Sequence, residues 1–364
     1  MNIRTIPIAL MLTLSAGLTA ANPVKLENIV DDVVVRHMTA KRIPGMSVAI
    51  VHNGKLVFSK GYGKASVEFG VPASPETVYP ISSVSKMFAG LLALRLAESG
   101  ELNLGASISK LLDDVPEDKN AITVRHLLQH THGLVDYYFS DSYETETGKT
   151  VGDSPVAELV AWSLGKPLNF EPGSEWAYSL AGYVILARIL EEAGGKPYET
   201  LVNQHVLAPL GISGAYGDSR VVVPGRNPVM YRLDGDKIVG HIVEFPQDSY
   251  AAGGLNLSVL EFAKLFIAIS RGDVISSDAA QQLWFNPTLA NGELANYGLG
   301  WFTYETSKKR WVVGHEGGGA SWVIYYPDHD IAVIALSNMS GARADILPYE
   351  IARDAFAAGL LRND

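Results

Sequence analysis

Apolar positions near the start of the chain follow the spacing of an amphipathic helix. They recur at intervals of three and four residues until Pro44 and Gly45 interrupt the pattern. These positions are Leu26, Ile29, Val30, Val33 and Val34. Residues 47–52 and 55–60 are then rich in β-branched and aromatic side chains, and Asn53-Gly54 joins them. An Asn-Gly pair between two such runs is typical of a β-hairpin, so the early chain predicts a helix followed by two antiparallel strands.

The strand pattern returns near the end of the chain, while the middle has helical periodicity. Strands are predicted at 311–313, 321–326 and 331–336, and a closing helix is predicted around 349–361. Between about residues 83 and 261 the pattern favours helices. The clearest of them are 157–163, 178–193 and a segment opened by the capping pair Ser258 and Glu261.

This arrangement predicts an α+β fold with one antiparallel sheet built from both chain ends. We expect residues 22–82 and 290–364 to form a sheet lobe flanked by helices, and residues 83–289 to form a mainly helical lobe. Sites that bind small molecules are commonly found where two such units meet. The active site is therefore expected between the lobes.

Residues 1–21 have the pattern of a secretory signal peptide. Arg4 is followed by an apolar run from residue 6 to 18 and by small residues that end at Ala20 and Ala21, where cleavage is expected. A membrane anchor is the alternative, but the run is short for a span of about 20 residues. We therefore expect a periplasmic or secreted protein with no stable membrane anchor after cleavage.

Composition narrows the classes of function. The chain has 364 residues, of which 47% are hydrophobic, and its formal net charge is −10. A nucleic-acid partner is not expected, because such proteins neutralise phosphates with clustered Lys and Arg. The chain has no cysteine, which excludes disulfides, thiolate metal sites and a cysteine nucleophile. A small-molecule substrate fits these limits, and the oligomeric state stays open.

Two Ser-x-x-Lys motifs occur, and their contexts differ. The motif from Ser107 to Lys110 lies just before a polar break at Asp113, Asp114 and Pro116. Ser83 instead begins an apolar helical pattern that reaches Gly100, and Lys86 lies three residues further on. Residues at i and i+3 share a helix face, so the Lys86 amine can reach the Ser83 hydroxyl.

Burial in the first turn of a helix favours a neutral Lys86 that accepts a proton, because desolvation and the helix dipole both oppose its charge. The Ser83 backbone amide can also form half of an oxyanion hole. A helix-capping serine beside a surface lysine is the structural alternative for this motif.

Three ordered motifs give the chain a family resemblance. They are Ser83-Val84-Ser85-Lys86, the run from Pro172 to Tyr183 that contains Tyr178-Ser179-Leu180, and Gly314-His315-Glu316-Gly317-Gly318-Gly319. With them the chain resembles serine β-lactamases of class C and penicillin-binding D-alanyl-D-alanine carboxypeptidases. Esterases and D-aminopeptidases of the β-lactamase fold belong to the same group. The resemblance runs from about residue 26 to 361 and is supported by residues 122–134 and 253–255.

The resemblance implies a set of catalytic roles. Ser83 would be the nucleophile, Lys86 its proton acceptor, and Tyr178 the group that passes the proton to the leaving group. Because a phenol titrates near 10, Tyr178 needs a neighbouring cation such as Lys86 or a protonated His315 to act as a base. The resemblance implies no cofactor and no metal.

The glycines that follow His315 would form the rest of the site. By the same resemblance, Gly317 lets the substrate backbone approach, and the Gly318 amide is the second oxyanion donor beside that of Ser83. In the alternative, the glycines 317–319 simply form a turn.

Two departures from the family pattern concern substrate binding. Leu180 stands where relatives have an Asn that contacts the substrate's acylamide, and Glu316 stands where many have Thr or Ser that bind its carboxylate. A Glu316 side chain that faces the cleft would repel a carboxylate, whereas one that turns away would not. We hypothesise that the preferred substrates are esters, amides or small peptides without that carboxylate. A β-lactamase or D-alanyl-D-alanine carboxypeptidase is the alternative.

Other functions are less well supported by the residues. His126 and His130 have the i, i+4 spacing of a zinc site, with His132 close by, but Leu127 stands where the zinc-protease motif has Glu. The nucleophile elbow of α/β-hydrolases is absent, because the stretch from Gly211 to Ala215 lacks its final glycine. A non-catalytic binder of cell-wall fragments stays open as a second class.

Overall fold

The computed structural model describes residues 23–217, 226–274 and 277–361. Its centre is a seven-stranded antiparallel sheet in the order β3-β2-β1-β12-β11-β10-β9. The strands are β1 Gly45–His52, β2 Lys55–Ser66, β3 Val71–Pro72, β9 Phe302–Glu305, β10 Trp311–Gly317, β11 Ser321–Tyr326 and β12 Ile331–Ser337. Strand β1 pairs with β12, which confirms the prediction of one sheet built from both chain ends.

The predicted hairpin joins β1 to β2. Asn53 and Gly54 both have positive φ angles, of 50° and 64°. Two successive residues with positive φ are what a type I′ turn requires, and this turn matches the twist of paired strands. The Asn-Gly pair therefore sets the pairing next to the turn, His52 with Lys55 and Val51 with Leu56, before the register shifts by one residue at Ile50.

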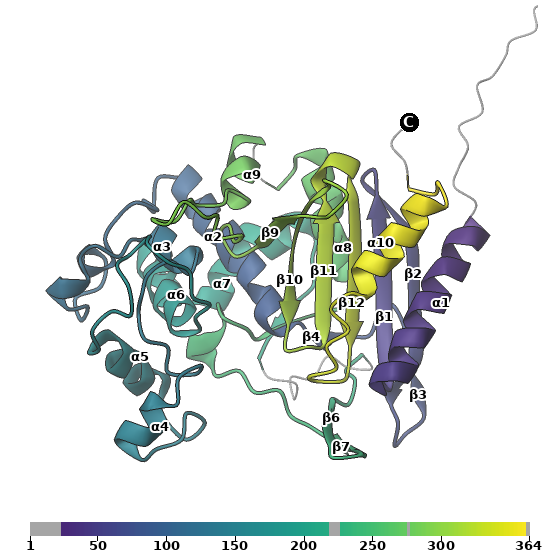
Figure 1. Cartoon of the computed structure of the whole chain (residues 1–364), viewed down its shortest axis with the longest axis horizontal. Coiled ribbons are helices and arrows are strands. Elements are labelled where there is room, and N and C mark those ends of the chain that lie inside the picture. The colour runs from purple at the N-terminus through teal and green to yellow at the C-terminus, as the bar shows by residue number, and fades with distance from the viewer. Residues whose placement is uncertain (1–22, 218–225, 275–276, 362–364) are drawn as a thin grey trace, which may run out of the picture.

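Helices cover both faces of the sheet. Helices α1 (Pro23–Lys41) and α10 (Leu347–Ala357) lie side by side over one face, where Figure 1 shows them in purple and yellow. Helix α8 (Val259–Arg271) packs against β1, β2 and β12 on the other face. Side chains alternate along each strand, so odd-numbered residues of β10 and β11 face the α8 side and even-numbered ones face the α10 side.

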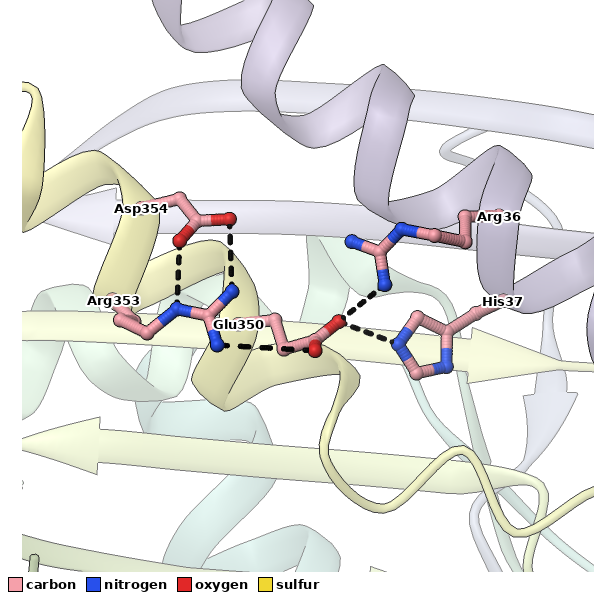
Figure 2. A network of polar contacts seen from close by, with 5 residues as sticks. All are labelled: Arg36, His37, Glu350, Arg353 and Asp354. Atoms are coloured by element: carbon pink, nitrogen blue, oxygen red, sulfur yellow. Dashed lines mark hydrogen bonds and ion pairs between the residues drawn. The ribbon is translucent and has the colours of Figure 1, made fainter.

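A polar network on Glu350 joins α10 to α1 (Figure 2). Its Oε2 atom accepts a hydrogen bond from Arg36 Nη1 at 2.9 Å and lies 2.8 Å from His37 Nε2. Arg353 lies 3.9 Å from the other carboxylate oxygen and also pairs with Asp354. The Glu350 side chain is only 15% exposed, so these contacts fasten the two terminal helices together.

The helical part of the fold lies beside the β9 edge of the sheet (Figure 1). Its helices are α2 Lys86–Glu98, α3 Val124–Leu128, α4 Ser142–Thr147, α5 Val156–Leu164, α6 Ala181–Gly194, α7 Tyr198–Val202 and α9 Ser277–Leu283. A small sheet completes it, made of β4 (Tyr79–Pro80), β8 (Leu255–Leu257) and β5 (Ala215–Tyr216). A second small sheet, of β6 (Tyr231–Asp234) and β7 (Lys237–Gly240), lies by the large sheet, where Tyr231 belongs to the apolar core on the α10 side. One apolar core joins α2 and α6 to the α8 side of the large sheet. Helix α8 falls within the lobe predicted as helical, although it packs on the sheet.

Two helix boundaries near the candidate site differ from the sequence-based expectation. A short 3-10 turn, Ser82–Ser85, precedes α2, so Ser83 lies before the α-helix and not in its first turn. The helix predicted over 178–193 begins at Ala181. Here the Asp136 carboxylate accepts hydrogen bonds from the Ser179 hydroxyl and the Ala181 amide, and Tyr178 lies in the segment that precedes the helix.

The predicted signal peptide lies outside the described residues. Among the helices of the described part, none combines the length and apolar content needed to cross a bilayer.

Candidate active site

Ser83 lies at the junction of the two lobes, in the turn that leads into α2. The preceding residue, Ser82, has a φ of 49°, a left-handed conformation that is uncommon for residues other than glycine. The backbone of Gly317 packs against this turn, and a Cβ atom at position 317 would lie 2.2 Å from the Ile81 carbonyl oxygen. Only glycine fits at position 317 without a shift of the backbone. The close contact brings β10 directly against the Ser83 turn.

Lys86 is completely buried beneath Ser83. Its Nζ atom donates a hydrogen bond to the Ala252 carbonyl at 2.7 Å and lies 3.4 Å from Ser83 Oγ. Burial lowers the pKa of Lys86 to about 7, although the charges of Asp136 and Glu316 act in the opposite direction. In a large share of the molecules, Lys86 is therefore neutral at pH 7 and able to take a proton from Ser83.

The second Ser-x-x-Lys motif has none of these features. Lys110 is exposed, and Ser107 exchanges a hydrogen bond with Ser109 at 2.9 Å. The structure thus separates the two motifs by burial, as their sequence contexts predicted.

Tyr178 lies beside Lys86. The Lys86 Nζ atom is 4.9 Å from the centre of the tyrosine ring. The Tyr178 hydroxyl is buried and has no hydrogen-bond partner in the described part of the chain. Burial raises its pKa, and the neighbouring Ser83 hydroxyl, which falls short of hydrogen-bond geometry, offsets part of this rise. Tyr178 is therefore a neutral phenol whose unsatisfied hydroxyl is available to a substrate atom.

His315 is buried on the same face of β10 as Gly317. Its Nδ1 atom lies 2.5 Å from the Glu316 carbonyl oxygen, and its Nε2 atom lies 2.9 Å from the Tyr297 hydroxyl. A carbonyl can only accept, so Nδ1 carries the proton and Nε2 accepts from Tyr297. Burial, together with the charge of Lys86, lowers the pKa of His315 to about 3. Because His315 is neutral, the protonated form of Lys86 is the cation that lies beside Tyr178.

The edge of β10 is open where the site lies. Strand β9 pairs with β10 only from Trp311 to Gly314, so the part from His315 to Gly317 pairs on one side alone, with β11. Gly318 follows in a left-handed turn with a φ of 58°, and its carbonyl accepts a hydrogen bond from the Gly341 amide at 2.9 Å. A substrate backbone can lie along this edge and bring a carbonyl group toward Ser83.

Glu316 is exposed and lies outside the cluster around Lys86. By strand alternation its side chain is on the α10 side of the sheet, opposite to His315 and Gly317. There it lines a cavity of about 240 Å³ together with Asp345, Trp322 and other residues. Partial desolvation beside this cavity and the charge of Asp345 raise the pKa of Glu316, while Arg343 and Lys86 lower it. The Glu316 side chain therefore turns away from Ser83, and its charge acts on Lys86 only at longer range.

Leu180 precedes the first turn of α6 and is partly buried. Its side chain packs against the main core and against the small cluster formed by Tyr137, Tyr143, Leu159 and Ala181. An apolar side chain in these surroundings offers no hydrogen bond to a substrate.

His130 is a site residue whose contacts the sequence did not predict. Its carbonyl accepts a hydrogen bond from the Ala177 amide at 3.0 Å, and its Nδ1 atom accepts one from the Ser179 amide at 3.1 Å. Its ring centre lies 4.4 Å from that of Tyr178. His130 thus holds the chain on both sides of Tyr178 and packs against the phenol between them.

Asp136 is a second residue that sequence reasoning missed. Its Oδ2 atom accepts hydrogen bonds from the Ser179 hydroxyl at 2.6 Å and the Ala181 amide at 2.9 Å. Its Oδ1 atom accepts from the amides of Tyr138 and Phe139 at 2.8 and 3.1 Å. A sequence signal exists for His130 alone, in the run of polar side chains from Gln129 to His132, whereas Asp136 follows the apolar pair Leu134 and Val135 with no such signal.

The three histidines considered for zinc have separate local roles. His126 accepts the Thr123 amide through Nδ1 at 3.3 Å and so caps α3, while His132 accepts the Leu134 amide at 3.0 Å. His130 lies beyond α3 and has a φ of 57°. Across the described residues, no three His, Asp or Glu side chains converge as metal ligands do.

Taken as chemistry, the cluster combines a nucleophile, a base and an acid. Ser83 supplies a hydroxyl, Lys86 an amine that is neutral in about half of the molecules at pH 7, and Tyr178 a protonated phenol. The aromatic rings of Trp176, Tyr297 and Phe302 pack around Tyr178, and the centre of the Tyr183 ring lies 5.2 Å from Lys86 Nζ. Such apolar surroundings strengthen charge interactions inside the site.

Comparisons with known proteins agree with this geometry. The family described as Beta-lactamase matches residues 30–356. A penicillin-binding protein of Bacillus subtilis (strain 168) is 28% identical over 313 residues, which make up 80% of this chain and 67% of that protein. The chain spans 62 to 67% of the length of the curated relatives it matches.

Solved structures share the fold. The octameric penicillin-binding protein homologue from Pyrococcus abyssi superposes with a TM-score of 0.79 and 28% identity, covering 93% of this chain and 78% of that one. EstCE1, described as a hydrolase with promiscuous acyltransferase activity, gives a TM-score of 0.77 at 22% identity over 92% of this chain and 98% of its own. At that identity the second likeness concerns the fold alone.

Proposed function

The chain belongs to the beta-lactamase family, and from this premise we propose that it is a serine hydrolase that forms an acyl-enzyme on Ser83. The observation that carries the proposal is the buried Lys86 amine, 3.4 Å from Ser83 Oγ and with a pKa of about 7. A surface lysine or a simple helix cap would have neither property. The neighbouring Tyr178 hydroxyl, buried and without a partner in the described part, completes the argument.

The proposed reaction follows from the positions of these groups. The Ser83 hydroxyl gives its proton to Lys86 as its oxygen attacks the carbonyl carbon, and the oxyanion is stabilised by the amides of Ser83 and Gly318. As the bond to the leaving group breaks, the Tyr178 hydroxyl gives that group a proton and regains one from the Lys86 ammonium. Water then attacks the acyl-enzyme with Lys86 as the base, and Ser83 recovers its proton.

Esters, amides or small peptides without a carboxylate near the scissile bond are the proposed substrates. The support comes from Leu180, which offers no carboxamide, and from the charge of Glu316, which turns away from the cluster yet still acts on Lys86 from the α10 side of the sheet. A β-lactam or D-alanyl peptide carries such a carboxylate and is the alternative. Export to the periplasm or the exterior is proposed as well, on the pattern of residues 1–21 alone.

Intact mass spectrometry tests the proposal. The protein is exposed in parallel to a nitrophenyl ester, a D-alanyl peptide and a penicillin, and the Ser83→Ala variant serves as control. We expect a transient acyl adduct and turnover with the ester, and neither with the variant. A lasting adduct with no hydrolysis of any compound would instead favour a non-catalytic binder, and ester turnover by the Ser83→Ala variant would refute the proposed function.

A further inference from the structure

A cavity of about 470 Å³ opens beside Tyr178, and Ser83 is not among the residues that line it. Its lining comes from three stretches of chain, which are residues 134–146, residues 162–169 at and after the end of α5, and residues 177–179. Because Tyr178 belongs to both the cavity and the proposed catalytic cluster, a group bound in the cavity would lie next to the phenol that serves the leaving group.

Aromatic and aliphatic side chains form much of the lining. Phe139 stands edge-on to Tyr178, with ring centres 5.8 Å apart, yet it is 57% exposed. Trp162, Leu134 and Leu168 provide further apolar surface. The exposed part of the Phe139 ring is therefore accessible to a bound group.

The charged groups of the cavity are already engaged. Asp136 accepts four hydrogen bonds from the protein, as described above. Glu146 pairs with Lys166 and accepts a hydrogen bond from Trp162 Nε1 at 3.1 Å. No cation in the lining is left to pair with an anionic ligand, and Asp136 would repel one.

We propose that this cavity is the subsite for an uncharged aromatic or branched aliphatic group of the substrate. The inference rests on the proposed acyl transfer at Ser83 and adds the class of side group that the enzyme selects. The group can belong to the acyl part or to the leaving alcohol or amine, since both are bonded to the carbonyl carbon that Ser83 attacks.

Two exposed phenylalanines provide a matched pair of variants. Phe139 and Phe285 are exposed to nearly the same extent, 57% and 58%, but only Phe139 is among the residues that line the cavity. Phe139→Ala removes an aromatic part of the lining, whereas Phe285→Ala removes an equally exposed ring outside it. Because both side chains are exposed, neither substitution threatens the fold.

Two series of uncharged esters locate the group. One series varies the acyl part from acetyl to phenylacetyl on a common nitrophenol, and the other varies the alcohol from methyl to benzyl on a common acid. We expect Phe139→Ala to lower kcat/KM for the aromatic member relative to the small member by about three- to tenfold in one series, which identifies the side. Phe285→Ala should leave both ratios unchanged. Equal loss for small and aromatic members, or equal effects of the two variants, would overturn the proposal.

A binding measurement separates this proposal from the proposed function. In the Ser83→Ala variant, calorimetry with p-nitrobenzyl alcohol should show saturable binding that the added Phe139→Ala change weakens, and p-nitrobenzoate should bind more weakly than the alcohol. This result would support the subsite even if no ester were turned over. Tighter binding of the anion, or binding that Phe139→Ala leaves unchanged, would refute the subsite even if Ser83 proved catalytic.

Discussion

Removing the Lys86 amine provides the sharpest test of the proposed chemistry. Burial lowers the pKa of this side chain from 10.5 to about 7. At pH 7 about half of the amines are then neutral, compared with roughly one in three thousand for an ordinary lysine. The buried position therefore raises the supply of free base by roughly 1,500-fold, which corresponds to between about 4 and 5 kcal/mol at about 1.4 kcal/mol per factor of ten.

The expected signature is the pH dependence of acylation. In a stopped-flow burst assay with a nitrophenyl ester, the acylation rate of the native protein should rise with pH and level off above a midpoint near the Lys86 pKa of about 7. Lys86→Met should slow acylation by about 10²- to 10⁴-fold and abolish this midpoint, since general-base catalysis contributes about that much. Methionine keeps an unbranched side chain of similar length in the buried space.

Stability should show the same titration without any substrate. The folded-state pKa of Lys86 lies below its unfolded value, so between pH 7 and 10 the unfolded chain holds a proton that the folded chain has released. The free energy of unfolding of the native protein should therefore increase with pH across this window, relative to Lys86→Met. A kinetic midpoint that lies near 10, or that persists in Lys86→Met, would refute the assignment of Lys86 as the base.

Three further predictions concern the surroundings of the site and the terminal helices. His130→Ala should slow acylation more than His130→Asn, because Asn tolerates the left-handed conformation and its oxygen can accept a hydrogen bond from the Ser179 amide. Equal acylation rates in the two variants, at equal thermal stability, would contradict a positioning role for His130. Glu316→Thr should improve turnover of a penicillin or D-alanyl peptide relative to a neutral ester, and an unchanged ratio would remove the proposed repulsion. Glu350→Gln should cost about 1–2 kcal/mol in urea denaturation at pH 7. Burial acts to raise the pKa of Glu350, but its hydrogen bonds to His37 and Arg36 lower the pKa overall. The loss of stability in Glu350→Gln should therefore shrink as the pH falls below about 4, where the carboxylate of the native protein becomes protonated. A loss that does not depend on pH would count against the network in Figure 2.

Local sequence signals were sufficient for most of the sheet. The Asn53-Gly54 pair defines the first hairpin, and the alternating runs near the end of the chain define β10, β11 and β12. Placing strands from both ends in one sheet was the simplest arrangement for strands separated by a long helical region. The register between β1 and β12, for example Met46 opposite Ser337, depends on contacts nearly 300 residues apart and cannot be obtained from the pattern.

The surroundings of the candidate site were harder to predict than its motifs. Helical periodicity continues through Tyr178, but the side chain of Asp136 ends this pattern by binding the Ser179 hydroxyl and the Ala181 amide. His130 reaches Ser179 across 49 residues. Such long-range hydrogen bonds leave no periodic trace in the chain. The protonation state of His315 likewise follows from its contacts with Tyr297 and the Glu316 carbonyl, which only the structure supplies.

The most direct test of the account is to locate the nucleophile chemically. A fluorophosphonate reacts with an activated serine hydroxyl, and peptide mass mapping identifies the modified residue. We expect stoichiometric labelling of Ser83 in the native protein and also in Ser107→Ala, which disrupts the second Ser-x-x-Lys motif. We expect no labelling of Ser83→Ala. Labelling that persists in Ser83→Ala, or that maps to Ser107, would contradict the assignment of Ser83 as the nucleophile.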